Sequence, residues 1–131
     1  TQGVSSAASD VYKRQANIIF GLPVVTISTH VRHDLSQFLS EILATFGLVL
    51  VIFLAREVAR QNIPILVGSY IASAYWFSSS TSFANPAVTI ARQFSDTFTG
   101  ISPSGIPSFV LAQIFGAILG YIVVQWLSRD M

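Results

Sequence analysis

Long apolar runs separated by short polar segments are the main pattern along this chain. Residues 36–55, 63–79 and 106–127 are almost free of charge, and Glu41 is the one charged residue within them. Each run approaches or reaches the roughly 20 apolar residues that a helix needs to cross a bilayer. The runs are apolar on all sides, whereas a surface helix of a soluble protein carries one apolar stripe. The pattern predicts three transmembrane helices and disfavours a soluble bundle with unusually apolar core helices.

Small residues take the place of a polar face on the last two predicted spans. Gly116 and Gly120 lie one helical turn apart in the last span. In the span before it, the small residues are Gly68, Ser69, Ala72, Ser73 and Ala74. Small side chains let membrane helices approach one another closely, so these positions are predicted to be helix contacts.

A short basic connection between the first two spans indicates the orientation. Arg56 and Arg60 lie in this connection, and short loops rich in Arg or Lys remain cytoplasmic. The connection is therefore predicted to face the cytoplasm. The polar segments before the first span and after the second are then expected to face outward.

The first fifteen residues, "TQGVSSAASDVYKRQ", do not share the apolar pattern of the rest. They have neither the apolar core of a signal peptide nor the length of apolar sequence that a membrane span requires. We interpret residues 1–15 as a non-native or disordered leader. Residues 16–20 are interpreted as the end of another apolar helix that begins upstream.

Composition excludes several classes of function. Charged residues make up 10% of the chain, against about 25% in soluble domains. The net charge is +1 and the seven basic residues are scattered, so no basic surface for nucleic acid is expected. Cysteine is absent, which excludes disulfides and thiolate metal sites. His30 and His33 flank Arg32 in a polar connection and are assigned to a surface loop. No metal, cofactor or catalytic nucleophile–base pair is expected.

A polar insert, "SSSTSFANPAVTIAR" at residues 78–92, separates the second and third spans. Asn85 is a strong N-cap, and Pro86 suits the first helical position. The helix predicted at residues 86–95 is about 15 Å long, which is half of a bilayer core. Its non-helical lead-in cannot face lipid, because unpaired backbone groups are costly there. We therefore predict a re-entrant half-helix that lines a pore, and the alternative is an outer loop with a short interfacial helix.

The groups at the start of this half-helix suit a neutral solute that forms hydrogen bonds. The Asn85 side-chain amide can donate, and the carbonyls of the non-helical stretch, at Thr81, Phe83 and Ala84, can accept. The helix macrodipole adds roughly half a positive charge at this end. Together these groups are predicted to favour uncharged solutes and to repel cations.

The sequence "SFANPAVTIAR", followed by a last span containing "AQIFGAILG", resembles the second signature of the aquaporin and glycerol-facilitator family, also called major intrinsic proteins. The resemblance implies an all-α membrane protein in which Asn85, Pro86 and Ala87 form one of two central pore motifs. It also implies that residues 16–131 are the C-terminal half of an inverted-repeat channel. The N-terminal half would then be missing, and the whole protein would form homotetramers.

The resemblance also assigns roles to four further residues. Val88 stands where family water channels usually carry arginine, and Arg92 comes four residues later. Two other filter positions fall on Ser82 and Ser73, so a wider and less cationic filter is expected. Glu41 would be a buried carboxylate that binds the re-entrant loop, and the alternative places it near the outer interface, partly solvated.

"STSFANPAVTIAR" resembles a bacterial aquaporin subgroup associated with arsenic-resistance genes. This resemblance implies a passive channel in the inner membrane for water, glycerol-like polyols or neutral metalloid species. Two alternatives remain open: half of an ion-coupled secondary transporter, and a membrane helix module that transports nothing. A coupled transporter is expected to carry several intramembrane ionisable residues, and Glu41 alone qualifies.

Overall fold

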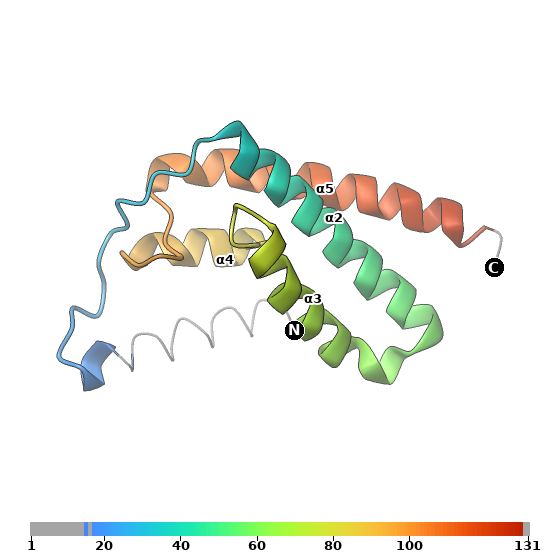
Figure 1. Cartoon of the computed structure of the whole chain (residues 1–131), viewed down its shortest axis with the longest axis horizontal. Helices are drawn as coiled ribbons and strands as arrows, with labels where there is room; N and C mark the ends of the chain where they lie inside the picture. The colour runs from blue at the N-terminus through green and yellow to red at the C-terminus, as the bar shows by residue number, and fades with distance from the viewer. Residues whose placement is uncertain (1–14, 16, 130–131) are drawn as a thin grey trace.

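Two long apolar helices form the frame of the protein, which is described here by a computed structural model (Figure 1). Helix α2 spans Leu35–Val58 and α5 spans Ile106–Leu127. Both are long and apolar enough to cross a membrane, yet only 28% of the apolar window of each is buried within the chain. A core helix of a soluble protein would be mostly buried, so their outward-facing apolar surface suits lipid or neighbouring protein.

The structure describes residues 15 and 17–129, and no strand occurs within them. The interpretation of residues 1–15 as a leader therefore falls, except for Gln15, outside the described residues. Residues 17–19 are helical, and the extended segment that follows leads to α2.

Helix α3 spans Ile63–Phe77 and follows the short 3₁₀ turn η1 at Arg60–Asn62. It ends two residues earlier than the stretch 63–79 predicted from hydropathy, because Ser78 takes an extended conformation with φ −105° and ψ 136°. Just beyond it, the Ser80 hydroxyl accepts from the Ser82 N–H at 3.3 Å, a local hydrogen bond of the kind that competes with helix. At 15 residues, α3 is about 22 Å long, so the span stops short of a full bilayer core within this chain.

The half-helix consists of α4 at Pro86–Ala91 and the 3₁₀ turn η2 at Arg92–Phe94. Asn85 is its N-cap, and its side-chain oxygen accepts a hydrogen bond from the Ala87 N–H at 2.8 Å. Helix α4 packs against α5 (Figure 1). A third 3₁₀ turn, η3 at Pro103–Gly105, then leads the chain into α5.

The segment before α2 lies along the segment after α4. The N–H of Ser28 donates to the Gln93 carbonyl at 2.8 Å, and the N–H of Ser102 donates to the His30 carbonyl at 2.8 Å. Two loops that are far apart in the sequence are thereby joined at one end of the bundle, beside α4. This pairing brings the side chain of Arg32 to the non-helical stretch before α4.

Glycines allow the close approach of α2 and α5. A Cβ added at Gly116 would collide with the Ile42 carbonyl oxygen, and it would lie 3.0 Å from the Thr45 Cβ. A Cβ added at Gly120 would lie 2.9 Å from the Val49 Cβ. Because backbone atoms stand in the way, a side chain at either glycine would force the helices apart.

We expect Gly116→Ala to destabilise the chain by about 1–3 kcal/mol, the usual cost of overpacking. Gly68→Ala is the matched control, because no atom lies within 4 Å of a Cβ at Gly68. The control is expected to be neutral or to stabilise α3 by up to about 1 kcal/mol through helix propensity. Thermal unfolding in detergent micelles measures both changes. Equal melting temperatures for the two variants would show that the glycine contact is unimportant.

Candidate functional site

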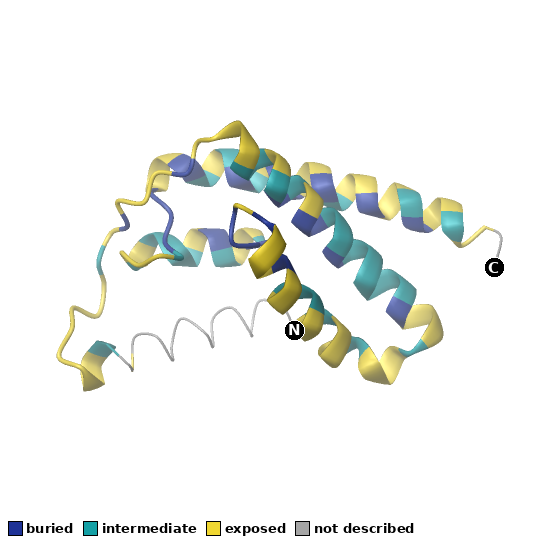
Figure 2. Cartoon of the chain, in the orientation of Figure 1, coloured by how far each residue is buried: buried dark blue, intermediate teal, exposed yellow. Residues whose placement is uncertain are grey.

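The stretch before α4, residues 78–85, has a strained backbone. Thr81, Ser82 and Ala84 have φ values of 62°, 50° and 48°, in the left-handed region that favours glycine. Each such residue costs of order 1–3 kcal/mol and persists only where its surroundings hold it. The stretch is also buried, and Figure 2 shows it dark blue between α3 and α4. Strain of this kind concentrates at functional sites.

Glu41 of α2 accepts hydrogen bonds from two backbone N–H groups of this stretch. Its side chain is fully buried, and one carboxylate oxygen accepts from the Phe83 N–H at 3.3 Å. The other oxygen accepts from the Ala84 N–H and, at 2.9 Å, from the side-chain amide of Gln113 in α5. Hydrogen bonds to an ionised group are roughly twice as strong as neutral ones, so this carboxylate stabilises the strained Ala84 and its neighbour Phe83 at once.

Arg32, in the segment before α2, donates hydrogen bonds to one carbonyl of this stretch and to two carbonyls of the loop after α4. Its Nε donates to the Gly100 carbonyl at 2.8 Å, Nη1 to the Ser80 carbonyl at 3.3 Å, and Nη2 to the Phe98 carbonyl at 2.8 Å. Burial lowers the pKa of the Arg32 guanidinium, and the negative charge of Glu41 opposes that shift. Arginine remains protonated throughout the physiological range, so Arg32 is a buried positive charge.

The start of the half-helix is fixed by a second set of hydrogen bonds. The Asn85 carbonyl accepts from the N–H and the hydroxyl of Thr89, both at 3.0 Å. The Thr89 hydroxyl in turn accepts from the Gln113 amide at 2.7 Å. Because the Asn85 side-chain oxygen is already bound to the Ala87 N–H, its NH₂ group is the part of the side chain that remains to donate.

The three predicted filter residues lie in different surroundings. Val88 packs against a buried cluster that contains Phe83. Ser82 is 4% exposed, and its hydroxyl has no hydrogen-bond partner among the described residues. Ser73 is exposed on α3 and donates to the carbonyl of Ser69 in its own helix at 2.8 Å. Within the described chain, no hydrogen bond joins Ser73 to Ser82 or Val88.

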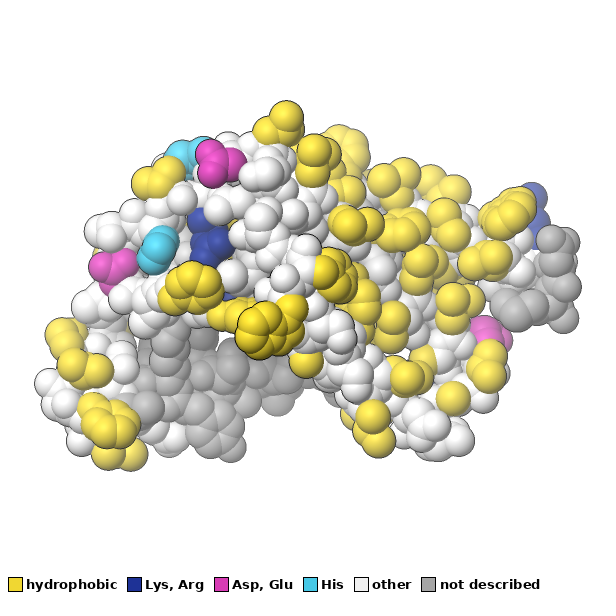
Figure 3. All heavy atoms as spheres, viewed as in Figure 1, with side chains coloured by type: hydrophobic (Ala, Val, Ile, Leu, Met, Phe, Trp, Pro, Cys, Tyr) yellow, Lys and Arg dark blue, Asp and Glu magenta, His cyan; other side chains and the backbone are white. Residues whose placement is uncertain are grey.

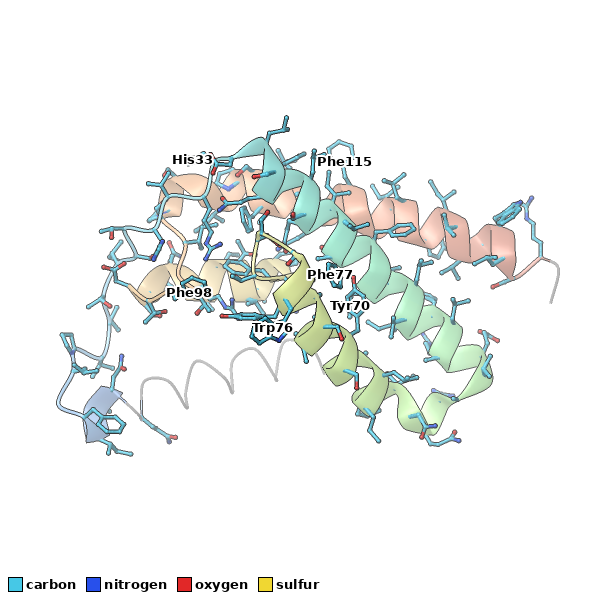
Figure 4. The ribbon with its side chains drawn as sticks, in the orientation of Figure 1. His33, Tyr70, Trp76, Phe77, Phe98 and Phe115 are labelled. Carbon is cyan, nitrogen blue, oxygen red and sulfur yellow. The ribbon has the colours of Figure 1, made fainter. Side chains whose placement is uncertain are left out.

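Sequence reasoning missed two residues of the site, Arg32 and Gln113. Gln113 carried a signal, because a buried amide in the middle of an uncharged span is costly without partners. Arg32 carried none, since its contacts come from loops about 50 to 70 residues away. His30 and His33, on either side of it, are exposed. The side chain of His33, which Figure 4 labels near the start of α2, lies 3.3 Å from the Ser104 hydroxyl. Within the described residues, no group of His, Cys, Asp and Glu could hold a metal ion.

Comparison with known proteins gives one informative likeness. The chain is 47% identical over 114 residues to aquaglyceroporin AqpS of Rhizobium meliloti (strain 1021). The match covers 87% of this chain and 49% of the relative, so the chain spans about half the length of the curated relative it matches. No protein-family model matches the chain, and no solved structure matches it.

The apolar helices and the buried half-helix define an all-helical membrane protein of the channel class, and the likeness is to a channel rather than to an enzyme. At this level of identity, over most of its length, the chain belongs to the aquaporin and glycerol-facilitator family. The fold class and the family predicted from the sequence are therefore confirmed.

Proposed function

We propose that this chain forms half of a passive channel for small uncharged solutes, such as water, glycerol-like polyols and neutral metalloid species. The observation that carries the proposal is the strained stretch before α4, which Glu41 and Arg32 hold from opposite sides. Helix breaks of this kind persist inside a membrane only where they are buried in protein or line a water-filled cavity. The name of the relative, aquaglyceroporin, supports the same class of solute.

The backbone carbonyl oxygens of this stretch would form a row of hydrogen-bond acceptors along the channel. Glu41 occupies the N–H groups of Phe83 and Ala84, which leaves their carbonyl oxygens, and that of Thr81, to line the path. The Asn85 amide then offers a donor at the N-terminus of α4, where Pro86 and Ala87 begin the helix. A hydroxyl-bearing solute can exchange its hydration for these groups one at a time. A cation would meet the positive end of the helix dipole.

A wide outer filter is the second part of the proposal. Val88, Ser82 and Ser73 carry small side chains, and pore diameter together with the lining donors and acceptors sets selectivity in such channels. The packing of Val88 against the cluster of Phe83, Ile101 and Phe109 supports a filter wall without a projecting side chain at this position. Such a filter would admit solutes larger than water.

The complete channel is proposed to need a second half and to assemble as a homotetramer in a bacterial inner membrane. The share of the relative that this chain covers supports the missing half. Apolar side chains also remain exposed, as Figure 3 shows over α2, α3 and α5, and Trp76 on α3 is 89% exposed. Lipid, the other half and neighbouring subunits would cover these surfaces.

The test uses the intact channel protein that contains this chain, reconstituted in proteoliposomes. After a hyperosmotic glycerol step we expect rapid shrinkage and then reswelling as glycerol enters, both faster than in empty vesicles. Volume changes no faster than those of empty vesicles would overturn the proposal. Uptake that requires a sodium or proton gradient would favour the coupled transporter. Asn85→Ala is expected to slow solute entry, and unchanged flux with normal expression would favour the helix module.

A further inference from the structure

Two arginines contact one aromatic ring in the stretch before α4. The guanidinium carbon of Arg32 lies 5.4 Å from the centroid of the Phe83 ring, and that of Arg92 lies 4.4 Å from it. Phe83 itself is 3% exposed and belongs to the stretch proposed to line the channel. Positive charge is therefore concentrated at this stretch, although Val88 is uncharged.

Arg32 differs from an ordinary surface arginine in its burial and its contacts. It is 5% exposed, and its three nitrogens donate to the backbone carbonyls of Gly100, Ser80 and Phe98. Figure 4 labels Phe98 in the loop after α4. These contacts fix its position, so it is not placed to follow a passing solute. In a low-dielectric site a fixed charge acts over a longer distance than in water. Its influence on the channel would therefore come through its charge and through the loop that it positions.

The opposite charge lies across the same stretch. Glu41 is fully buried and binds the N–H groups of Phe83 and Ala84, while Arg32 binds the carbonyl of Ser80. Without Arg32, the buried Glu41 carboxylate would lie beside the proposed solute path with one fewer positive charge to balance it. Rings of Asp or Glu are the means by which cation channels attract their ions. A channel that needs Glu41 as a scaffold must therefore cancel its charge if cations are to be excluded.

We propose that Arg32 determines specificity by cancelling the charge of Glu41, so that the channel conducts neutral solutes and excludes cations. Arg32 also positions the loop after α4 through its bonds to Phe98 and Gly100. The inference rests on the proposed function, since it concerns selectivity at the same site. It assigns a selectivity role to a residue that precedes α2 and lies 53 positions before Asn85 in the sequence.

The experiment compares Arg32→Gln with the wild type in the intact channel, reconstituted in proteoliposomes, and follows glycerol entry and potassium leak in parallel. We expect potassium leak to rise on the order of tenfold in R32Q, whereas glycerol entry continues. Arg32→Lys keeps the charge and is expected to exclude potassium as the wild type does. Arg56→Gln is the matched control, because Arg56 lies at the other end of α2 and also contacts a ring, that of Phe53, at 5.7 Å.

The outcomes separate this inference from the proposed function. A wild type that admits no glycerol overturns the channel itself. A wild type that conducts glycerol, together with an R32Q variant that remains tight to potassium, overturns the role of Arg32 alone. A potassium leak that rises equally in R32K and R32Q also overturns the role of Arg32, because the loss of potassium exclusion would then follow from altered structure and not from charge.

Arg32→His keeps the proposal testable if R32Q does not fold. Histidine has an ordinary pKa of about 6.5, so the charge at this position can be changed within one folded variant. Potassium leak through R32H is expected to be low at acidic pH and to rise as the pH increases through the histidine pKa. The wild type should show no such rise. A leak through R32H that does not change with pH would overturn the proposal.

Discussion

Replacing Glu41 by alanine is expected to destabilise the chain by about 3–5 kcal/mol, the range for removal of one partner from a buried charged network. The N–H groups of Phe83 and Ala84 would lose their acceptor, and a buried unsatisfied donor costs about 1–3 kcal/mol. The amide of Gln113 would lose one of its two acceptors. Because Ala84 is also held at a positive φ, the stretch before α4 is expected to leave its left-handed conformation.

Thermal unfolding in detergent and amide hydrogen exchange measure this result. Exchange at Phe83 and Ala84 should accelerate more than exchange elsewhere in the chain. Glu57→Ala is the matched control, since Glu57 lies in the same helix and is exposed; its effect should stay within about 0.5 kcal/mol. Glu41→Gln retains one acceptor oxygen, so its loss of stability should lie between those of Glu41→Ala and Glu57→Ala. Equal stability of the two alanine variants would show that Glu41 does not hold the stretch.

Val88→Arg is expected to convert the channel into one that passes water but restricts larger neutral solutes. A long cationic side chain at position 88 would narrow the proposed filter and add donors to it. Glycerol entry should fall about tenfold or more, within the range that steric discrimination at a pocket reaches, while osmotic water flow persists. Both are measured by light scattering from proteoliposomes of the intact channel.

Val88→Met separates size from charge in this experiment. Methionine adds length without charge and has flexible rotamers, so glycerol entry through V88M should fall less than through V88R. Unchanged glycerol entry in V88R would mean that Val88 does not lie at the filter. Equal reductions in the two variants would assign the effect to narrowing alone.

Elements set by local sequence were predicted well. The three apolar runs correspond to α2, α3 and α5, because the hydropathy of a run directly reflects the solvent that its side chains require. Asn85 and Pro86 mark the start of α4 through capping chemistry confined to a few neighbouring residues. The early end of α3 was missed, since hydropathy continues through Tyr75, Trp76 and Phe77 and does not register the local hydrogen bonding of the serine-rich residues that follow.

Contacts between distant segments were not predictable in the same way. Nothing local to Arg32 indicates that loops 48 to 68 residues away will surround it. Its polar neighbours, including the exposed His30 and His33, suggested a solvated loop. Burial of a charge depends on acceptors that arrive from elsewhere in the fold, and a single sequence does not carry that information.

The sequence by itself determined the apolar helices, the polar break between two of them and the position of the half-helix, because hydropathy, capping and proline geometry act within a few residues. The tertiary structure alone decided how the strained stretch Thr81–Ala84 is held. That arrangement requires Glu41 from α2, Gln113 from α5 and Arg32 from the segment before α2 to meet at one place. Left-handed, buried backbone persists where the surrounding structure holds it, and here part of that support comes from charged side chains of distant segments.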